Sequence, residues 1–218
     1  MTQILLKILP LDIAATLSPV IFALALLLLG STVKPKLRTF SFFLGTLIVG
    51  IIISLIGFSI GQAVAGESGK NEVSAILDLF FAIVFIYFAI KALTSGDRKI
   101  RTSPKEEKHP IAKWLLTGIV ISATNFDALF LCLNAAKEVS STSGIELASK
   151  IFLIIVNLAF FTLPVTLPLL FYLIAPKIAG KILSKANLFV IKYARYIVFV
   201  LFVLFAAVLL YRALIYFI

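Results

Sequence analysis

Cysteine and histidine are almost absent from this chain of 218 residues, which contains one of each. A single cysteine, Cys132, cannot form an intramolecular disulfide, and together with the single histidine, His109, it cannot complete a cysteine-and-histidine metal cage. Charged residues are also scarce, at 14% of the chain, whereas an average soluble domain has about a quarter. The composition therefore excludes an ordinary soluble domain.

Apolar residues replace the missing charges, because they make up 61% of the chain and give a mean hydropathy of +1.14. A helix that crosses a bilayer needs about twenty of them in succession. Six stretches meet this requirement: 3–30, 38–65, 73–95, 112–136, 146–175 and 188–216. We therefore predict an all-α, polytopic integral membrane protein with six transmembrane helices, whose main partner is the lipid bilayer.

The 20 Lys and Arg residues exceed the 10 Asp and Glu residues, so the net charge is +10. This excess would suggest nucleic acid in a soluble chain, but here the basic residues border apolar spans and no nucleic-acid partner is expected. Most of them flank the connections between spans one and two, three and four, and five and six. By the positive-inside rule these connections are cytoplasmic, and both termini lie outside.

The longest polar stretch predicts an internal division of the chain. It gives a first repeat at 1–95, a cytoplasmic linker at 96–111 that contains His109, and a second repeat at 112–218. Each repeat has three spans, and an odd number of crossings makes their orientations opposite. The stretch DIAATLSPVIFALALLLL aligns weakly with GIVISATNFDALFLCLNAA. We therefore predict a 3+3 inverted repeat with a binding site at the repeat interface.

The centres of the first and fourth spans carry residues that start helices. Ser18 is a good N-cap and Pro19 a good first helical residue, and Asn125 and Asp127 supply capping residue types in the fourth span. If both spans break there, two half-helix N-termini can bind an anionic group. The alternative is that Pro19 only kinks the first helix.

Three aspartates fall inside the predicted spans. Asp12 and Asp78 lie near the outer ends of theirs, so we expect them to reach headgroups or water. Asp127 lies deeper, and no Lys or Arg occupies the middle of any span. Asp127 is therefore the candidate for proton or ion coupling, with N-capping of a half-helix as the alternative.

The fifth span contains Pro164 and Pro168, which remove helical hydrogen bonds and predict a kinked, deformable helix. Two nearby threonines are expected to satisfy the carbonyls that are freed. Asn157 is expected either to meet the Asn125 region as part of the binding site or to form an interhelical hydrogen bond.

The second span has small residues along one helical face, at Thr46, Gly50, Ser54, Gly57 and Gly61. We interpret this face as intramolecular packing, with a homodimer seam as the alternative. The aromatic-rich spans 73–95 and 188–216 are interpreted as lipid-facing walls, so no cofactor is predicted.

The pattern LSPVIFALALLLLGS, a short basic loop and FSFFLGTLIVGIIISLIG resemble the GAP family of peptidoglycolipid- or sulfolipid-addressing proteins, in the lysine-exporter (LysE) superfamily. The stretch TLPVTLPLLFYLIAPKIAGKILSKANLFVIKYARYIVFVLFVLFAAVLLYRAL is similar to that family's fifth helix, basic loop and last span. The resemblance implies a multi-pass protein of the cytoplasmic membrane that exports a small molecule or delivers an envelope glycolipid. Many superfamily members carry Asn-Pro in the first helix of each half, whereas this chain has Ser18-Pro19 and Asn125-Phe126.

The leading hypothesis is therefore an exporter driven by a gradient or a partner, since no nucleotide-binding P-loop is present. A non-transporting scaffold for envelope-lipid export and a divalent-metal exporter are the alternatives, although the carboxylates are spread in depth and no metal site is predicted. Enzyme activity is not expected. A thiol-electron carrier needs two membrane cysteines, and a hydrolase needs an embedded base, whereas His109 lies in a loop.

Overall fold

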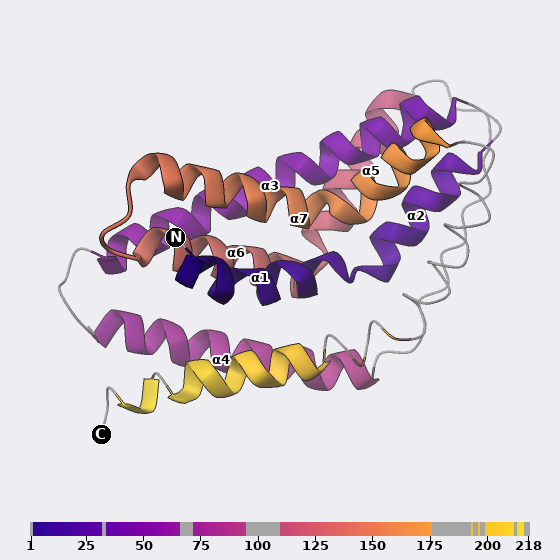
Figure 1. The fold of residues 1–218 in the computed structure, drawn as a ribbon. Helices are drawn as coiled ribbons and strands as arrows, with labels where there is room; N and C mark the ends of the chain where they lie inside the picture. The colour runs from indigo at the N-terminus through magenta and orange to yellow at the C-terminus, as the bar shows by residue number, and fades with distance from the viewer. Residues whose placement is uncertain are drawn as a thin grey trace.

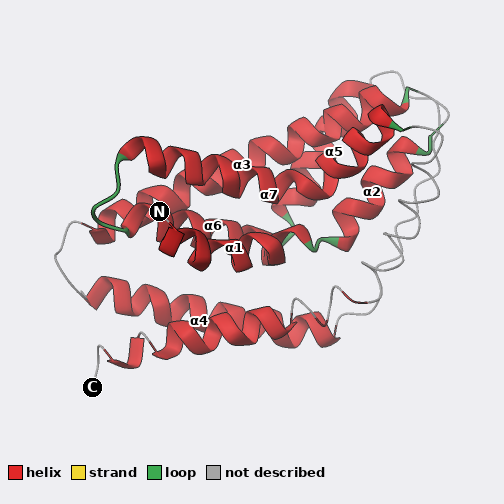
Figure 2. Cartoon of the chain, in the orientation of Figure 1, coloured by secondary structure: helices red, strands yellow, loops and turns green. Residues whose placement is uncertain are grey.

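In the computed structural model the chain folds into α-helices, and no strand occurs among the described residues (Figure 2). The described residues are 2–31, 34–65, 72–94, 110–175, 193, 196, 199–211 and 213–215. The labelled helices are α1 (Thr2–Thr16), α2 (Pro19–Leu29), α3 (Pro35–Ala65), α4 (Glu72–Thr94), α5 (Pro110–Ala123), α6 (Phe126–Ser141) and α7 (Leu147–Ile174). A further apolar helix covers Phe199–Ile215. The all-α prediction is confirmed.

The predicted first and fourth spans are each built from two helices. α1 and α2 are bent by 55° at their junction, and α5 and α6 by 75°. α3, α4 and α7 are long and apolar enough to cross a membrane, so the described residues hold three candidate spans, or up to five if each bent pair is one span. Residues 95–109, which include most of the predicted linker, and part of the predicted sixth span lie outside the described residues.

Successive spans run in alternating directions between two ends of the molecule (Figure 1). One end holds the starts of α1, α4 and α7 and the ends of α3 and α6. The other end holds the end of α2 and the starts of α3 and α5. This is the arrangement that short connections between antiparallel spans produce.

α3 contacts helices from both halves of the chain. It contacts α5 and α6 from the second half of the chain as well as α2 and α7, and α7 in turn contacts α1 and α2 from the first half. The helices of each half therefore pack largely against helices of the other half, instead of closing two separate three-helix bundles.

Small residues explain the close approach of α3 to α6. A Cβ added at Gly57 would overlap the carbonyl oxygen of Leu133, and one added at Gly61 would overlap the carbonyl oxygen of Lys137. Small side chains let helix backbones come together in this way. The prediction that this face of the second span is an intramolecular packing surface is confirmed.

Aromatic side chains join α4 to the C-terminal helix. The rings of Phe85 and Phe88 are buried and lie 5.4 and 5.9 Å, between centroids, from the ring of Phe202. Phe80 and Tyr87, on the opposite side of α4, are exposed. The interpretation of both aromatic spans as lipid-facing walls is therefore wrong for this face, because the two helices bury it against each other.

We expect Gly118→Ala to destabilise the protein by about 1–3 kcal/mol, because the new methyl group would overlap the carbonyl oxygen of Phe42 in α3. Gly30→Ala is the matched control, since the nearest atom to its new methyl group is the Leu26 carbonyl oxygen at 3.4 Å, an ordinary contact. Thermal unfolding of the purified proteins in a neutral detergent measures the difference. Equal melting temperatures for the two variants would contradict the close contact between α3 and α5.

Candidate functional site

The first helix break occurs at Ser18. Its backbone is extended (φ −97°, ψ 94°), and Pro19 is the first residue of α2, in agreement with the preferences of these residue types. The Ser18 side chain makes no capping hydrogen bond to the described backbone of α2. It is buried and accepts a hydrogen bond from the second break instead. Of the two expected alternatives, a break or a kink of the first span, the structure has the break. The Ser18 hydroxyl bonds to the start of α6 instead of capping its own helix.

The second break occurs at Asn125, the N-cap residue of α6. The Asn125 Nδ2 donates a hydrogen bond of 3.0 Å to the Ser18 Oγ. α2 and α6 run away from this contact toward opposite ends of the molecule (Figure 1). The two breaks, one from each half of the chain, are therefore in contact in space.

Both breaks present the positive ends of helices. The first helical hydrogen bonds join the Phe22 amide to the Ser18 carbonyl and the Leu129 amide to the Asn125 carbonyl. Amides that precede them in α2 and α6 have no partner within their own helix. Asp127 is partly exposed in the first turn of α6, where the helix dipole favours a carboxylate. An anionic group of a ligand would be favoured at this point for the same reason.

Asp12 lies inside the bundle and not at a membrane surface, so the prediction that it reaches headgroups or water is wrong. It is 1% exposed, and neither carboxylate oxygen has a hydrogen-bond partner among the described residues. It is close enough to Cys132 of α6 to interact electrostatically with its thiol. Because α1 ends at Thr16, Asp12 is about one turn from the first break, and α6 and α7 cover this part of α1.

A band of polar groups joins α3, α6 and α7 near that carboxylate. The Asn157 Nδ2 donates a hydrogen bond of 3.0 Å to the Cys132 carbonyl, and the Ser54 Oγ lies 3.5 Å from the Cys132 Sγ. Asn157 thus makes an interhelical hydrogen bond, which was one of its two expected roles. The Cys132 carbonyl that accepts this bond lies about two turns along α6 from Asn125. The Oδ1 atoms of Asn157 and Asn134 have no hydrogen-bond partner within the described ranges.

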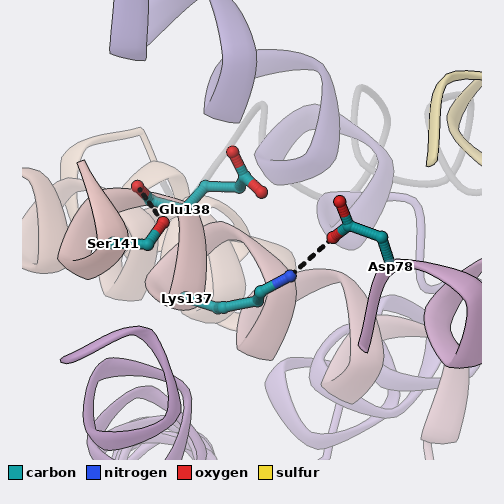
Figure 3. A network of polar contacts seen from close by, with 4 residues as sticks. All are labelled: Asp78, Lys137, Glu138 and Ser141. Carbon is teal, nitrogen blue, oxygen red and sulfur yellow. Dashed lines mark hydrogen bonds and ion pairs between the residues drawn. The ribbon is translucent and has the colours of Figure 1, made fainter. Parts of the chain in front are cut away.

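Asp78 and Lys137 form a buried ion pair between α4 and α6 (Figure 3). The Lys137 Nζ lies 2.7 Å from the Asp78 Oδ1, and the side chains are 1% and 4% exposed. Glu138 lies beside the pair and is also buried. The expectation that Asp78 reaches headgroups or water is wrong, because α4 packs this residue against α6. The signal in the sequence was the presence of opposite charges at the same end of two spans.

Pro164 and Pro168 are buried in α7, which continues through both as one helix. Thr162 donates to the Leu158 carbonyl and Thr166 to the Thr162 carbonyl. Neither acceptor is a carbonyl whose helical hydrogen bond a proline removes. The threonines therefore do not satisfy the freed carbonyls, contrary to the prediction. The prolines lie in the helix that contacts both arms of the first break, α1 and α2.

His109 lies outside the described residues. Within the described part of the chain, no group of three or more His, Cys, Asp or Glu side chains is placed to hold a metal ion.

Comparison with known proteins gives one match. The family model SfLAP, described as Sap, sulfolipid-1-addressing protein, matches residues 8–215. The matched region contains both helix breaks, the ion pair and all of α2–α7. No curated protein and no solved structure matches the chain.

We expect Asp78→Leu or Lys137→Met alone to destabilise the protein by about 3–5 kcal/mol, because each leaves one buried charge without its partner. The double variant should recover most of this loss, since two apolar side chains then replace the pair. Lys7→Met, at an exposed position, is the control and should change little. Unfolding in detergent micelles measures all four proteins, and additive single losses would contradict the pairing.

Proposed function

The chain belongs to the sulfolipid-1-addressing protein (Sap) family, and we propose that it is a transporter that moves an envelope glycolipid or another small molecule across or out of the cytoplasmic membrane. The family resemblance predicted from the sequence is thereby confirmed. The family description supports a role in lipid addressing, and the apolar helices support a multi-pass membrane protein.

In this proposal the membrane is crossed six times, as a 3+3 inverted repeat of the lysine-exporter type. The spans are α1–α2, α3, α4, α5–α6, α7 and the helix Phe199–Ile215. The alternating helix ends support this topology (Figure 1). The end at which α3 and α5 begin is cytoplasmic, because the Lys and Arg residues concentrate in the connections at that end. Both termini are then outside.

The hydrogen bond between Ser18 and Asn125 is the observation that carries the proposal. Inverted-repeat transporters bind substrate where discontinuous helices of the two repeats meet, with half-helix N-termini directed at anionic groups. Here two breaks from different halves meet in that way. The proposed site comprises Ser18, Pro19, Asn125 and Asp127, together with Asn157 of α7, which bonds to the Cys132 carbonyl of α6.

α7 is the element that flexes in this mechanism. Pro164 and Pro168 lack the amide hydrogens that would otherwise stiffen it, and the helix packs on α1 and α2. A change in its curvature would therefore move the two arms of the first break relative to α6.

Asp12 is the group that we assign to energy coupling, in place of Asp127. An ionised carboxylate without a partner is costly inside a membrane protein, so uptake of a proton or a cation here removes an interior charge. The first break is about one turn away. An ionised Asp12 repels an anionic substrate at the break and a neutralised one does not, which links substrate binding to ion binding.

We expect Asn125→Ala and Ser18→Ala each to lower the rate of glycolipid appearance at the cell surface about two- to tenfold, the effect of losing one hydrogen bond. Thr124→Ala is the matched control, because among the described residues the Thr124 hydroxyl bonds only to the last turn of α5. Mass spectrometry of lipids extracted from the surface of expressing cells measures the rate. Unchanged delivery in both break variants would favour the non-transporting scaffold over a transporter.

We expect Asp12→Asn to abolish most delivery, since an amide cannot take up a proton in the neutral pH range, while Asp127→Asn retains the larger part. The same surface-lipid measurement compares the two variants at equal membrane abundance. Full activity of Asp12→Asn would remove Asp12 from the mechanism, and loss of activity only in Asp127→Asn would return the coupling role to Asp127.

A further inference from the structure

Arg38 is a buried cation in the first turn of α3. The residue is 1% exposed, and its Nε, Nη1 and Nη2 atoms have no hydrogen-bond partner among the described residues. Arg38 is the first residue of the predicted second span, next to a basic connection, and the structure places it inside the bundle. A buried guanidinium is costly unless an anion pairs with it.

The register of α3 and α5 places Trp114 of α5 at the same position along the helix pair as Arg38 of α3. α3 and α5 run side by side in the same direction (Figure 1). Their register is fixed by the Phe42 carbonyl against Gly118 and by the hydrogen bond of 3.0 Å from the Ser122 Oγ to the Thr46 Oγ1. One turn before the Phe42–Gly118 contact, the same register brings Arg38 opposite Trp114. The Trp114 Nε1 is also buried without a hydrogen-bond partner in the described chain.

Further positive charge lies beside these two donor groups. The Lys113 Nζ lies 5.4 Å from the centroid of the Trp114 ring. The starts of α3 and α5 add two positive helix ends. The described acidic side chains lie elsewhere, at Asp12 in α1, Asp78 in α4, Asp127 at the second break, and Glu138 and Glu146 near the opposite end.

We propose that Arg38 and Trp114 bind a tetrahedral oxyanion, a sulfate or phosphate group, carried by an anionic lipid or present as the free ion. Such a group offers oxygens for the guanidinium fork and one more for the indole N–H. A carboxylate would satisfy the guanidinium fork but leave the indole N–H less well matched. The lipid as source rests on the proposed function, whereas the anion chemistry does not.

This anion site is separate from the helix breaks. Thr46, whose hydroxyl pairs with Ser122 just before the second break, lies about 12 Å along α3 from Arg38. In the proposed topology Arg38 is at the depth of the cytoplasmic headgroups. A lipid would therefore bind there before its headgroup reaches the breaks.

The test uses the purified full-length chain in a neutral detergent with a sulfated galactosylceramide, unsulfated galactosylceramide, phosphatidylglycerol and inorganic sulfate as probes. Native mass spectrometry measures bound lipid, and thermal unfolding measures stabilisation by each probe. We expect the sulfated or phosphate lipid, or the free ion, to bind the wild-type protein, and binding to fall by roughly tenfold or more in Arg38→Leu. Trp114→Phe should weaken binding several-fold, and Lys36→Leu, an exposed charge on the same turn, should not.

Without ligand, Arg38→Leu should melt at a higher temperature than the wild type, because it removes a buried charge that lacks a partner. Sulfated and phosphate lipids that bind without inorganic sulfate identify a lipid site, and inorganic sulfate binding alone identifies a free-ion site. Equal anion binding in wild type, Arg38→Leu and Trp114→Phe would overturn the proposal. So would a lower ligand-free melting temperature in Arg38→Leu. Break variants that lose lipid delivery but keep anion binding show that this site is separate from the transport mechanism. Variants that lose anion binding but keep lipid delivery show the same.

Discussion

One constraint acts on the whole fold: in hydrocarbon, backbone groups freed at a helix break must be covered by protein. The hydrogen bond between Ser18 and Asn125 marks the place where the two breaks cover each other. One broken span alone would direct its free amides at lipid. Two breaks that face each other share a single protected, polar region. The other contacts of the bundle hold α1–α2 and α5–α6 at the positions where the breaks coincide.

The two broken spans are held in place because helices of each half of the chain pack against helices of the other half. α3 from the first half lies along α5 and α6, and α7 from the second half lies along α1 and α2. Glycines on α3 and α5 allow backbones to touch, so a small lateral shift would produce overlaps. In the proposed mechanism, movement is therefore concentrated in α7, where Pro164 and Pro168 remove backbone hydrogen bonds.

Among the described residues, charged side chains are buried inside the bundle at three positions, and one of these is an ion pair. Asp78 and Lys137 neutralise each other near one end. Asp12 beside the first break and Arg38 near the other end have no hydrogen-bond partners among the described residues. Buried charges in membrane proteins are costly and mark functional positions. In the proposed mechanism the unpaired cation receives an anionic headgroup and the unpaired carboxylate binds a coupling ion.

The sequence by itself determined the helical class, the positions at which two spans could break and the close-packing face of α3, because N-cap preference, proline geometry and small-residue spacing act within a few residues of the chain. It did not determine that Asn125 meets Ser18, that Asp12 is enclosed, or that Asp78 pairs with Lys137. Those contacts depend on which faces of the helices pack together. The sequence of a helix that is apolar on all sides carries little information about which face packs against which neighbour. Only the tertiary structure, by fixing the neighbours of each polar group, decided them.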